Sequence, residues 1–318
     1  MTALVIGMLG LGQATEDSLG IDSNLNLLSF GKFESVGSDV EGRVAVGGNA
    51  VNAFTPLGGP PQARYAGNGL KVGGTLNFSN GQIFCNTVVG GNLDLSNGVI
   101  HGDMVAGGTL NYSAATLWES TQGSQGSVAL GPNFVTKQQQ LTSLSHSFDA
   151  LANTDAGSLS GGWFVLDTHG ANLEVFDLGS ANVSSNLRLD NLAANTTVII
   201  NVQGAAIDFG RNDYQNFSAG HVLFNFADAG STSFANAGVN ASFLAPLATF
   251  SGTSGHITGQ VIVGSWSGNV QVNDAAFTGV TPVPEPQTDA LMLAGLGVVT
   301  WFARRRRETT SRASLSIA

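Results

Sequence analysis

A carboxylate and an imidazole stand two residues apart in the segment Asp167, Thr168 and His169, and Glu174 and Asp177 follow shortly after them. Side chains at positions i and i+2 of a strand point to the same face, so this pair could do general acid–base work. The alternative is a solvated strand end with its turn. We favour that alternative because no third group or nucleophile motif accompanies the pair. HExxH, GxSxG, P-loop and Cys/His cluster motifs are also missing, so we predict no catalytic residue.

The densest charged motif is the sequence SDVEGR at residues 38–43. It makes Asp39, Glu41 and Arg43 candidate ligand-binding residues. The alternative is an ion pair between Arg43 and Asp39 or Glu41 that closes the end of the first coil of the fold. Aromatic side chains offer a second kind of binding surface, because an indole ring can stack on a sugar or fill a core. The candidates are Trp118, Trp163 and Trp266.

Oxygen ligands recur at regular places, and hard oxygen ligands suit Ca²⁺. The recurring residues are Asp94, Asp103, Asn77, Asn92 and Asn111. Asn more often closes a turn by bonding its own backbone, so we favour a structural role and predict no metal and no cofactor. A flat threonine array for ice binding is not expected either, because Asn92 stands between Thr75 and Thr109 in the repeat.

The composition indicates an acidic, glycine-rich and foldable chain. Its 318 residues include 43 Gly, and only 11 % are charged, which excludes coiled coils and helical bundles. The hydrophobic share of 42 % argues against a disordered chain. Residues 15–283 hold 7 Lys and Arg against 19 Asp and Glu, so we expect no nucleic-acid partner. The single Cys85 allows no intramolecular disulfide, and its alignment with Gly102 predicts a buried small residue.

Glycine pairs recur every 17 residues, at Gly73, Gly90 and Gly107, and each pair precedes an alternating segment. A looser copy begins 26 residues before Gly73, at Gly47. The alternation predicts two interior ladders, Leu76/Leu93/Leu110 and Phe78/Leu95/Tyr112. We expect the Gly-Gly and Asn-Gly pairs to form corners where a positive φ is tolerated. Repeats of this length predict a mainly β chain, a parallel β-helix or β-solenoid.

A second set of alternating segments lies at residues 240–246 and 255–265. Between the two sets, residues 134–153 carry apolar side chains at helical spacing, and Pro132 and Asn133 fit the start of a helix. We therefore expect one α-helix beside the solenoid. The segments 163–167, 173–178, 197–202 and 221–227 are predicted strands.

The two ends of the chain look like processing signals. Residues 1–14 contain a short apolar run before an acidic start, which is typical of a signal peptide, here truncated because no basic residue precedes Lys32. The alternative is a hydrophobic first strand. Near the other end, the apolar residues 290–303 precede the cluster Arg304, Arg305, Arg306 and Arg307. A helix of that length reaches only about 21 Å, so we predict a short, transiently inserted transmembrane helix with the arginines in the cytoplasm.

Pro284, Glu285 and Pro286 come before this apolar segment, and the order of motif, helix and arginine cluster resembles the PEP-CTERM sorting signal of Gram-negative bacteria that make exopolysaccharide. The resemblance implies that the membrane protease exosortase recognises these three residues and cleaves the chain. The signal would cover residues 282–307, with residues 308–318 as a cytoplasmic tail. The alternative is an ordinary C-terminal membrane anchor.

Residues 15–281 resemble the choice-of-anchor A domain, an adhesin domain of bacterial surfaces. The resemblance rests on the opening segments 19–31 and 38–49 and on the closing segment GHITGQVIVGS at residues 255–265. It implies no catalytic residue. We therefore expect a secreted or cell-surface adhesin, processed by exosortase through transient insertion in the inner membrane and acting on exopolysaccharide or other matrix components. The alternatives are a carbohydrate-active β-helix enzyme, with a groove between facing carboxylates, and a self-assembling matrix protein.

Overall fold

A computed structural model describes residues 17–53 except 23, residues 68–117, 123–125, 128 and 130, and residues 133–280 except 211. The chain divides into two compact units, Met1–Thr281 and Pro282–Ala318, and every described residue belongs to the first unit. The predicted signal peptide, sorting signal with its helix, and tail lie outside the described residues. Among the residues that are described, no helix is long and apolar enough to cross a membrane.

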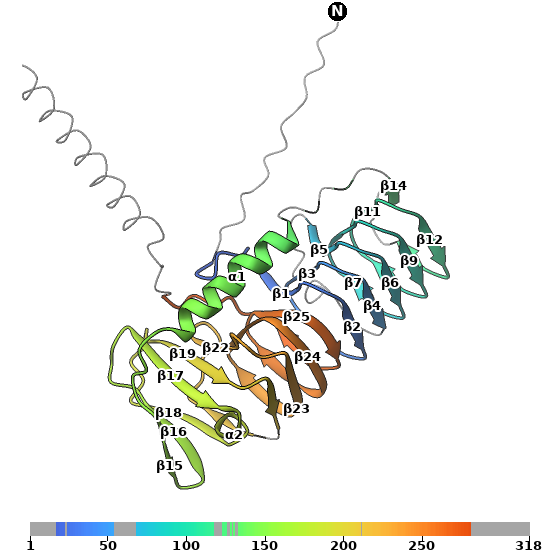
Figure 1. Cartoon of the computed structure of the whole chain (residues 1–318). Coiled ribbons are helices and arrows are strands. Elements are labelled where there is room, and N and C mark those ends of the chain that lie inside the picture. Colours follow the sequence, from blue (N-terminus) through green and yellow to red (C-terminus); the bar gives the residue numbers. More distant parts are fainter. Residues whose placement is uncertain are drawn as a thin grey trace, which may run out of the picture. The chain divides into compact units, whose positions relative to one another are not determined.

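The first unit is a β-solenoid, because almost all of its strands pair in parallel from one coil to the next (Figure 1). The prediction of a mainly β, parallel β-helix is therefore confirmed. Each full coil passes over three faces, which we name the helix face, the open face and the third face. The described residues form one long helix, α1 (Phe134–Asp149), and one short helix, α2 (Ser180–Val183).

The helix face contains, in spatial order, β17 (Leu173–Gly179), β19 (Thr197–Gln203), β22 (Val222–Asn225), the start of β24 (Ser242–Thr258), the start of β25 (Val261–Gly268), β1 (Leu25–Ser29), β3 (Arg43–Val46), β5 (Asn68–Val72), β8 (Asn86–Val89), β11 (Met104–Ala106) and β14 (Gly123–Gln125). The open face contains β20 (Ala206–Phe209), the start of β23 (Ser231–Asn240), the middle of β24, the end of β25, β2 (Phe33–Val36), β4 (Ala50–Ala53), β6 (Leu76–Ser79), β9 (Leu93–Ser96) and β12 (Leu110–Ser113).

The third face is made of shorter ladders. They contain β15 (Ser158–Ser160), β16 (Trp163–Asp167), β18 (Leu187–Asp190) and β21 (Tyr214–Gln215), then the ends of β23 and β24 with β26 (Gln271–Asn273), then β7 (Gln82–Ile83), β10 (Val99–Ile100) and β13 (Thr116–Leu117). Among the described strands, β15 and β16 form a hairpin and pair antiparallel, whereas the other pairs are parallel.

The chain enters this solenoid in its middle. Strand β1 pairs with β3 on one side and with β25, near the end of the domain, on the other. Coils from β1 run outward to β14, and α1 then leads back along the helix face toward the opposite end (Figure 1). From β17 the coils run inward again until β25 meets β1 and β2. The solenoid is therefore continuous in space, although its first and last coils in sequence lie side by side in its middle. We call the contact between β25 and the strands β1 and β2 the seam.

Helix α1 is the predicted flanking helix, and it ends at Asp149 rather than at residue 153. The Asn133 side chain caps its start by accepting a hydrogen bond from Val135 N (2.8 Å), as the sequence predicted. Leu141 and Phe148 are buried against the outward-pointing apolar side chains of the helix face. Strands covered on both faces need apolar side chains on both, which explains the run TVIINV in β19.

Buried polar groups fix α1 on the sheet. Asn225 Nδ2 donates to Ser145 O (2.8 Å) and to Asn201 Oδ1 (2.9 Å), and Ser145 Oγ donates to Asn225 Oδ1 (2.6 Å). Asn201 Nδ2 donates to Phe148 O (3.0 Å) and to Asp177 Oδ1 (3.0 Å). Because these buried groups are partnered only when helix and strands are aligned, the network sets the position of the helix along the solenoid.

The 17-residue repeat is confirmed as a coil. In adjacent strands Leu76, Leu93 and Leu110 are partners, and so are Phe78, Leu95 and Tyr112. The four inward-pointing side chains of β6 and β9 are buried. On β12, Leu110 is half-buried and Tyr112 is 44 % exposed, because β12 is the last strand of the open face. In the other half, the four predicted strands correspond to β16, β17, β19 and β22. Their coils differ in length, because the number of residues between register partners is not constant. Val198 pairs with Val222, whereas Leu223 pairs with the nearer Ser242.

The glycine pairs act by close packing and not by a positive φ, which corrects the sequence interpretation. None of Gly73, Gly90 and Gly107 has a positive φ. Instead, a Cβ atom on each of them would collide with the carbonyl oxygen of the equivalent glycine in the preceding coil. The Asn-Gly corners do follow the prediction, because Asn80 and Asn97 have φ values of 57° and 48°.

Candidate binding face

The open face presents one row of outward-pointing residues, one from each of its nine strands. Neighbours in the row are register partners, in the order Asp208, Ser233, Ser251, Ser267, Glu34, Val51, Asn77, Asp94 and Asn111. Adjacent strands lie about 4.8 Å apart, so the row repeats a side chain at that interval along the solenoid. Eight of the nine residues are polar, and Val51 is the apolar exception, 40 % exposed.

One half of the open face carries a regular array of hydroxyl groups. Two outward positions on each of three neighbouring strands are in register, Ser231/Thr249/Ser265 and Ser233/Ser251/Ser267. Two hydroxyls of the second row donate to carboxylates at its ends, Ser233 Oγ to Asp208 Oδ1 (2.7 Å) and Ser267 Oγ to Glu34 Oε2 (3.4 Å). A hydroxyl whose proton is engaged still offers oxygen lone pairs to a ligand. This array was not predicted from the sequence, although the alternating Ser and Thr residues of these segments could have indicated it.

The other half carries amide, carboxylate and hydroxyl groups. Asn111 Nδ2 donates to Asp94 Oδ1 (2.6 Å), and Asn77 is the next residue of the row. Beside them runs a second row of exposed or half-buried hydroxyls, Ser79, Ser96 and Ser113. These residues line a shallow hollow of about 340 Å³, together with residues such as Tyr112, which follows Asn111 on β12. The hollow therefore presents mainly amide, carboxylate and hydroxyl groups.

Thr75, Asn92 and Thr109 do not lie on this face but at the corner that precedes it. Asn49 Oδ1 accepts a hydrogen bond from Thr75 N (2.9 Å), and Asn92 Oδ1 accepts one from Thr109 N (3.0 Å). Asn and Thr alternate there because an Asn side chain binds the backbone of the next coil. The change from Thr75 to Asn92 between successive coils therefore reflects the hydrogen bonds of the corner. It does not bear on whether the open face carries an array of hydroxyl groups.

Asp39, Glu41 and Arg43 lie where the first coil meets the closing strand of the domain. Gln271 Nε2 donates to Asp39 Oδ2 (3.4 Å), and Glu41 Oε2 accepts a hydrogen bond from Asp274 N (3.0 Å). Both acidic side chains therefore contact β26 or the residue that follows it. The carboxylate that pairs with Arg43 comes from outside the motif, since Arg43 Nη1 donates to Asp22 Oδ2 (2.6 Å). The ligand-binding role of these three residues stays a prediction.

The candidate acid–base residues have structural partners. Asp167 Oδ1 accepts a hydrogen bond from Asn191 Nδ2 (2.7 Å). The buried Glu174 accepts hydrogen bonds from the backbone N of His169 (2.8 Å) and of Ala171 (3.0 Å), so it holds the turn between β16 and β17. These contacts agree with the interpretation of the segment as a strand end with its turn.

Trp266 and Cys85 both belong to the core. The Trp266 ring stacks on Phe250, with centroids 4.4 Å apart and planes at 3°, and it is fully buried. Trp163 is half-buried on β16, and Trp118 lies outside the described residues. Cys85 is buried, as predicted, and this burial raises the pKa of its thiol to about 12.

Three of the residues considered for Ca²⁺ bind each other or the backbone through their side chains. Asp94 Oδ1 accepts a hydrogen bond from Asn111 Nδ2 (2.6 Å), and Asn92 Oδ1 accepts one from Thr109 N (3.0 Å). Within the part of the chain that the structure describes, no three His, Cys, Asp or Glu side chains are grouped so that they could hold a metal ion. The recognition residues Pro284, Glu285 and Pro286 and the cluster of Arg304, Arg305, Arg306 and Arg307 lie outside the described residues.

Two family models match the chain, one over most of the first compact unit and one over part of the second. Residues 18–274 match the family model described as "Putative Ice-binding-like adhesive domain", and residues 282–307 match the PEP-CTERM protein-sorting motif. This motif implies export to the cell surface and processing by exosortase. No curated protein matches the chain.

Two solved structures are similar to it. The first, an ice binding protein from an Antarctic Biological Consortium, has 14 % identity and a TM-score of 0.35, with 81 % of this chain and 89 % of that chain covered. The second, an ice binding protein from an Antarctic bacterium of the Flavobacteriaceae, has 12 % identity and a TM-score of 0.26, with 85 % and 100 % covered. By the match over residues 18–274, this chain belongs to the family of ice-binding-like adhesive domains.

Proposed function

We propose that the chain is a non-enzymatic surface adhesin whose open face binds a polysaccharide of the extracellular matrix. The observation that carries the proposal is the row of nine register partners, eight of them polar, along the open face. A polysaccharide is itself a repeating array of hydroxyl groups that donate and accept hydrogen bonds. Many weak contacts along one row add up to a useful affinity when both partners are repetitive.

The negative charge of the open face limits which classes of polysaccharide could bind there. Glu34, Asp94 and Asp208 place three carboxylates in the row. The neighbouring Lys32 Nζ donates to Glu34 Oε2 (2.8 Å) and offsets one of these charges, so Asp94 and Asp208 leave the row with a net negative charge. A polymer of uronic acids or sulfated sugars would be repelled by such a surface. The proposed ligand is therefore a neutral or basic polysaccharide.

The sorting motif supports the proposed route of delivery. We propose that exosortase recognises Pro284, Glu285 and Pro286 while residues 290–303 are transiently inserted in the inner membrane of a Gram-negative cell. The arginines at 304–307 would hold the C-terminal end in the cytoplasm. The processed domain would then act at the cell surface or in the exopolysaccharide of a biofilm.

Co-sedimentation with the host exopolysaccharide tests the binding proposal. We expect residues 15–281 to sediment with the polymer, and the variant Ser96→Trp to lose most of this retention because the ring would stand on the open face. Asn240→Trp is the matched control, since Asn240 is also exposed but lies on β23 where that strand contributes to the third face. Equal retention of both variants would show that the polymer does not use this half of the open face.

A reducing-end assay in the same experiment tests the enzyme alternative. Asp167 and Asp190 are register partners on β16 and β18, so two carboxylates do face each other there. Arg188 binds Asp190 through two hydrogen bonds of 2.7 and 2.8 Å, which ties up that carboxylate. New reducing ends that disappear in Asp167→Asn would overturn the adhesin proposal and establish a polysaccharide-cleaving enzyme.

Ice is a second candidate ligand, and the six-hydroxyl array of β23, β24 and β25 is the observation that favours it. Hydroxyl groups in register at strand spacing can order water molecules in a lattice. A measurement of thermal hysteresis separates the two candidates, with Ser251→Tyr as the variant because Ser251 lies in the middle strand of the array. Hysteresis that is lost in Ser251→Tyr and kept in Ser96→Trp would assign the hydroxyl array to ice.

A further inference from the structure

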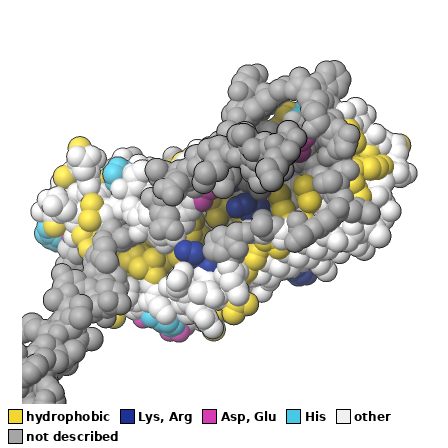
Figure 2. All heavy atoms as spheres, turned by 90° about the horizontal axis from the view of Figure 1, so that it is seen from above, with side chains coloured by type: hydrophobic (Ala, Val, Ile, Leu, Met, Phe, Trp, Pro, Cys, Tyr) yellow, Lys and Arg dark blue, Asp and Glu magenta, His cyan; other side chains and the backbone are white. Residues whose placement is uncertain are grey.

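A cavity of about 250 Å³ lies on the helix face, beside the first turn of α1. Helix α1 begins at Phe134, and strands β3 and β5 continue the sheet beyond that point. Figure 2 shows hydrophobic side chains gathered on this side of the molecule, with Lys and Arg side chains among them.

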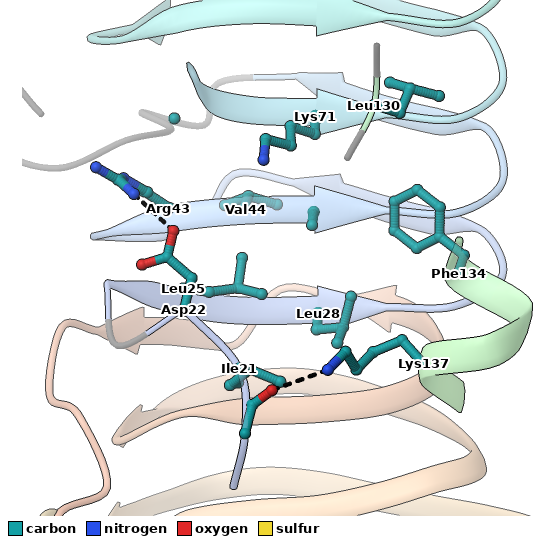
Figure 3. A pocket seen from close by; sticks show the side chains of 13 residues that line it. Ile21, Asp22, Leu25, Leu28, Arg43, Val44, Lys71, Leu130, Phe134 and Lys137 are labelled. Atoms are coloured by element: carbon teal, nitrogen blue, oxygen red, sulfur yellow. Dashed lines mark hydrogen bonds and ion pairs between the residues drawn. The ribbon is translucent and has the colours of Figure 1, made fainter. Parts of the chain in front are cut away.

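The wall of the cavity is largely apolar. Leu28 and Ala45 are buried outward-pointing residues of β1 and β3, and they form its floor. Leu25 lies on the same strand as Leu28 and also lines the cavity (Figure 3). The ring of Phe134 lies at the side where α1 begins. An apolar ligand group would displace water from these surfaces, which favours its binding.

Three cations line the same cavity, and two of them have partners there, Arg43 in an ion pair and Lys137 in a hydrogen bond to a backbone carbonyl. Arg43 Nη1 pairs with Asp22 Oδ2 (2.6 Å), and Lys137 Nζ donates to Gly20 O (2.9 Å), which ties α1 to the segment before β1. Lys71 is different, because its ammonium makes no hydrogen bond or ion pair within the described residues. Figure 3 shows Lys71 across the cavity from Phe134, on the same side as Arg43.

We propose that this cavity binds the free acid form of a single aliphatic chain, with its carboxylate on Lys71 and its hydrocarbon body against Leu28, Ala45 and Phe134. An apolar wall beside an ammonium that has no hydrogen-bond or ion-pair partner among the described residues is complementary to a molecule with one anionic end and an apolar body. An esterified lipid offers no carboxylate to Lys71, so the proposal commits to the free acid. The volume, below the range of about 300–1,000 Å³ typical of drug-sized ligands, favours one short chain.

The proposal is independent of the polysaccharide function, because the cavity lies on the helix face and not on the open face. Its test uses residues 15–281, the first compact unit, which contains the whole described core. Decanoate and 1-decanol are titrated into this domain by calorimetry without detergent. We expect saturable binding of decanoate and at least tenfold weaker binding of 1-decanol, because the alcohol lacks the charge that Lys71 pairs with.

Variants at Lys71 decide the outcome. Lys71→Met keeps the aliphatic stem and removes the charge, and it should weaken decanoate binding about tenfold or more. Lys71→Arg should retain binding, and the control Lys32→Met, a lysine of the open-face side, should leave it unchanged. No saturable binding of decanoate, equal binding of decanoate and 1-decanol, or undiminished binding by Lys71→Met would each overturn the proposal. An equal loss in Lys32→Met would also overturn it, since net charge alone would then explain the effect.

Discussion

The rings of Phe33 and Trp266 stack at the seam of the solenoid, with their centroids 6.0 Å apart and their planes inclined by 21°. Phe33 belongs to the first coil and Trp266 to the last, and the two residues are register partners in adjacent parallel strands. Trp266 also stacks on Phe250 of the coil before it. One indole ring therefore joins the two halves of the domain, which are built from opposite ends of its sequence.

Replacement of Trp266 should separate these halves. We expect Trp266→Ala to destabilise the domain by about 3–5 kcal/mol, because a large aromatic side chain leaves a cavity between two coils. Chemical denaturation followed by circular dichroism measures the loss. Leu247→Ala is the control, since Leu247 belongs to the neighbouring strand and is 48 % exposed. A stability unchanged in Trp266→Ala would mean that the seam is held by its backbone hydrogen bonds alone.

The buried amide of Asn225 should be essential for the position of α1. Asn225→Ala removes three hydrogen bonds and leaves Ser145 and Asn201 without these partners in the core. We expect a loss of about 2–3 kcal/mol in the free energy of unfolding. The control Asn240→Ala, at an exposed position, should change it by less than about 0.5 kcal/mol. Hydrogen exchange gives a second readout, because a helix loosened from the sheet should show a larger rise in the exchange rate of its amides than the β-strands do.

Ala114 occupies a corner that the preceding coils fill with asparagine. Its φ of 50° matches the 57° of Asn80 and the 48° of Asn97, and Asn97 Nδ2 donates to Asn80 Oδ1 (2.7 Å). A left-handed conformation costs an alanine about 1–2 kcal/mol, and less for asparagine. Ala114→Asn should therefore raise the melting temperature, and Asn97→Ala should lower it. A lower melting temperature for Ala114→Asn would contradict the strain argument.

The stacked glycines predict a third kind of stability effect. A Cβ atom at Gly90 would collide with the carbonyl oxygen of Gly73, so Gly90→Ala should push two coils apart. We expect a loss of about 1–3 kcal/mol, the usual cost of overpacking a rigid core. Gly210→Ala is the matched control, because open space surrounds that position and its φ is not positive. If both variants unfold at the same denaturant concentration, the coils are less tightly stacked than the geometry implies.

The parts of the fold that repeat could be predicted, because a constant coil length makes equivalent residues recur. The ladders of Leu76 and Phe78 follow from the 17-residue spacing, and α1 follows from its own apolar spacing and its asparagine cap. The coils between β17 and β24 could not be predicted in this way, because their lengths differ. Nor does any local pattern reveal that β25 pairs with β1, since that contact joins distant parts of the sequence.

The candidate binding face was only partly accessible from the sequence for the same reason. The sequence shows that Asn77, Asp94 and Asn111 recur, but it indicates turn residues or metal ligands. Their place in one row of the open face follows only from the register of the strands. The hydroxyl array combines residues such as Ser233 and Ser267 from coils of unequal length, so no alignment within the sequence brings them together. The cavity beside α1 combines a helix, a loop and three strands, and only the folded chain shows it.

Cys85 offers a direct test of how tightly the coils close. It is the single cysteine of the chain, and burial raises the pKa of its thiol from 9.0 to about 12, so labelling by a thiol reagent reports on one site. We expect negligible labelling at pH 8 in the native domain and a rate that rises with denaturant. Because the folded pKa is the higher one, the thiol contributes stability that is complete below pH 9.0 and declines as the pH rises toward about 12. Rapid labelling at pH 8 without denaturant would show instead that the solenoid opens at this coil, and Cys85→Ser, which cannot react, controls for reaction at other groups.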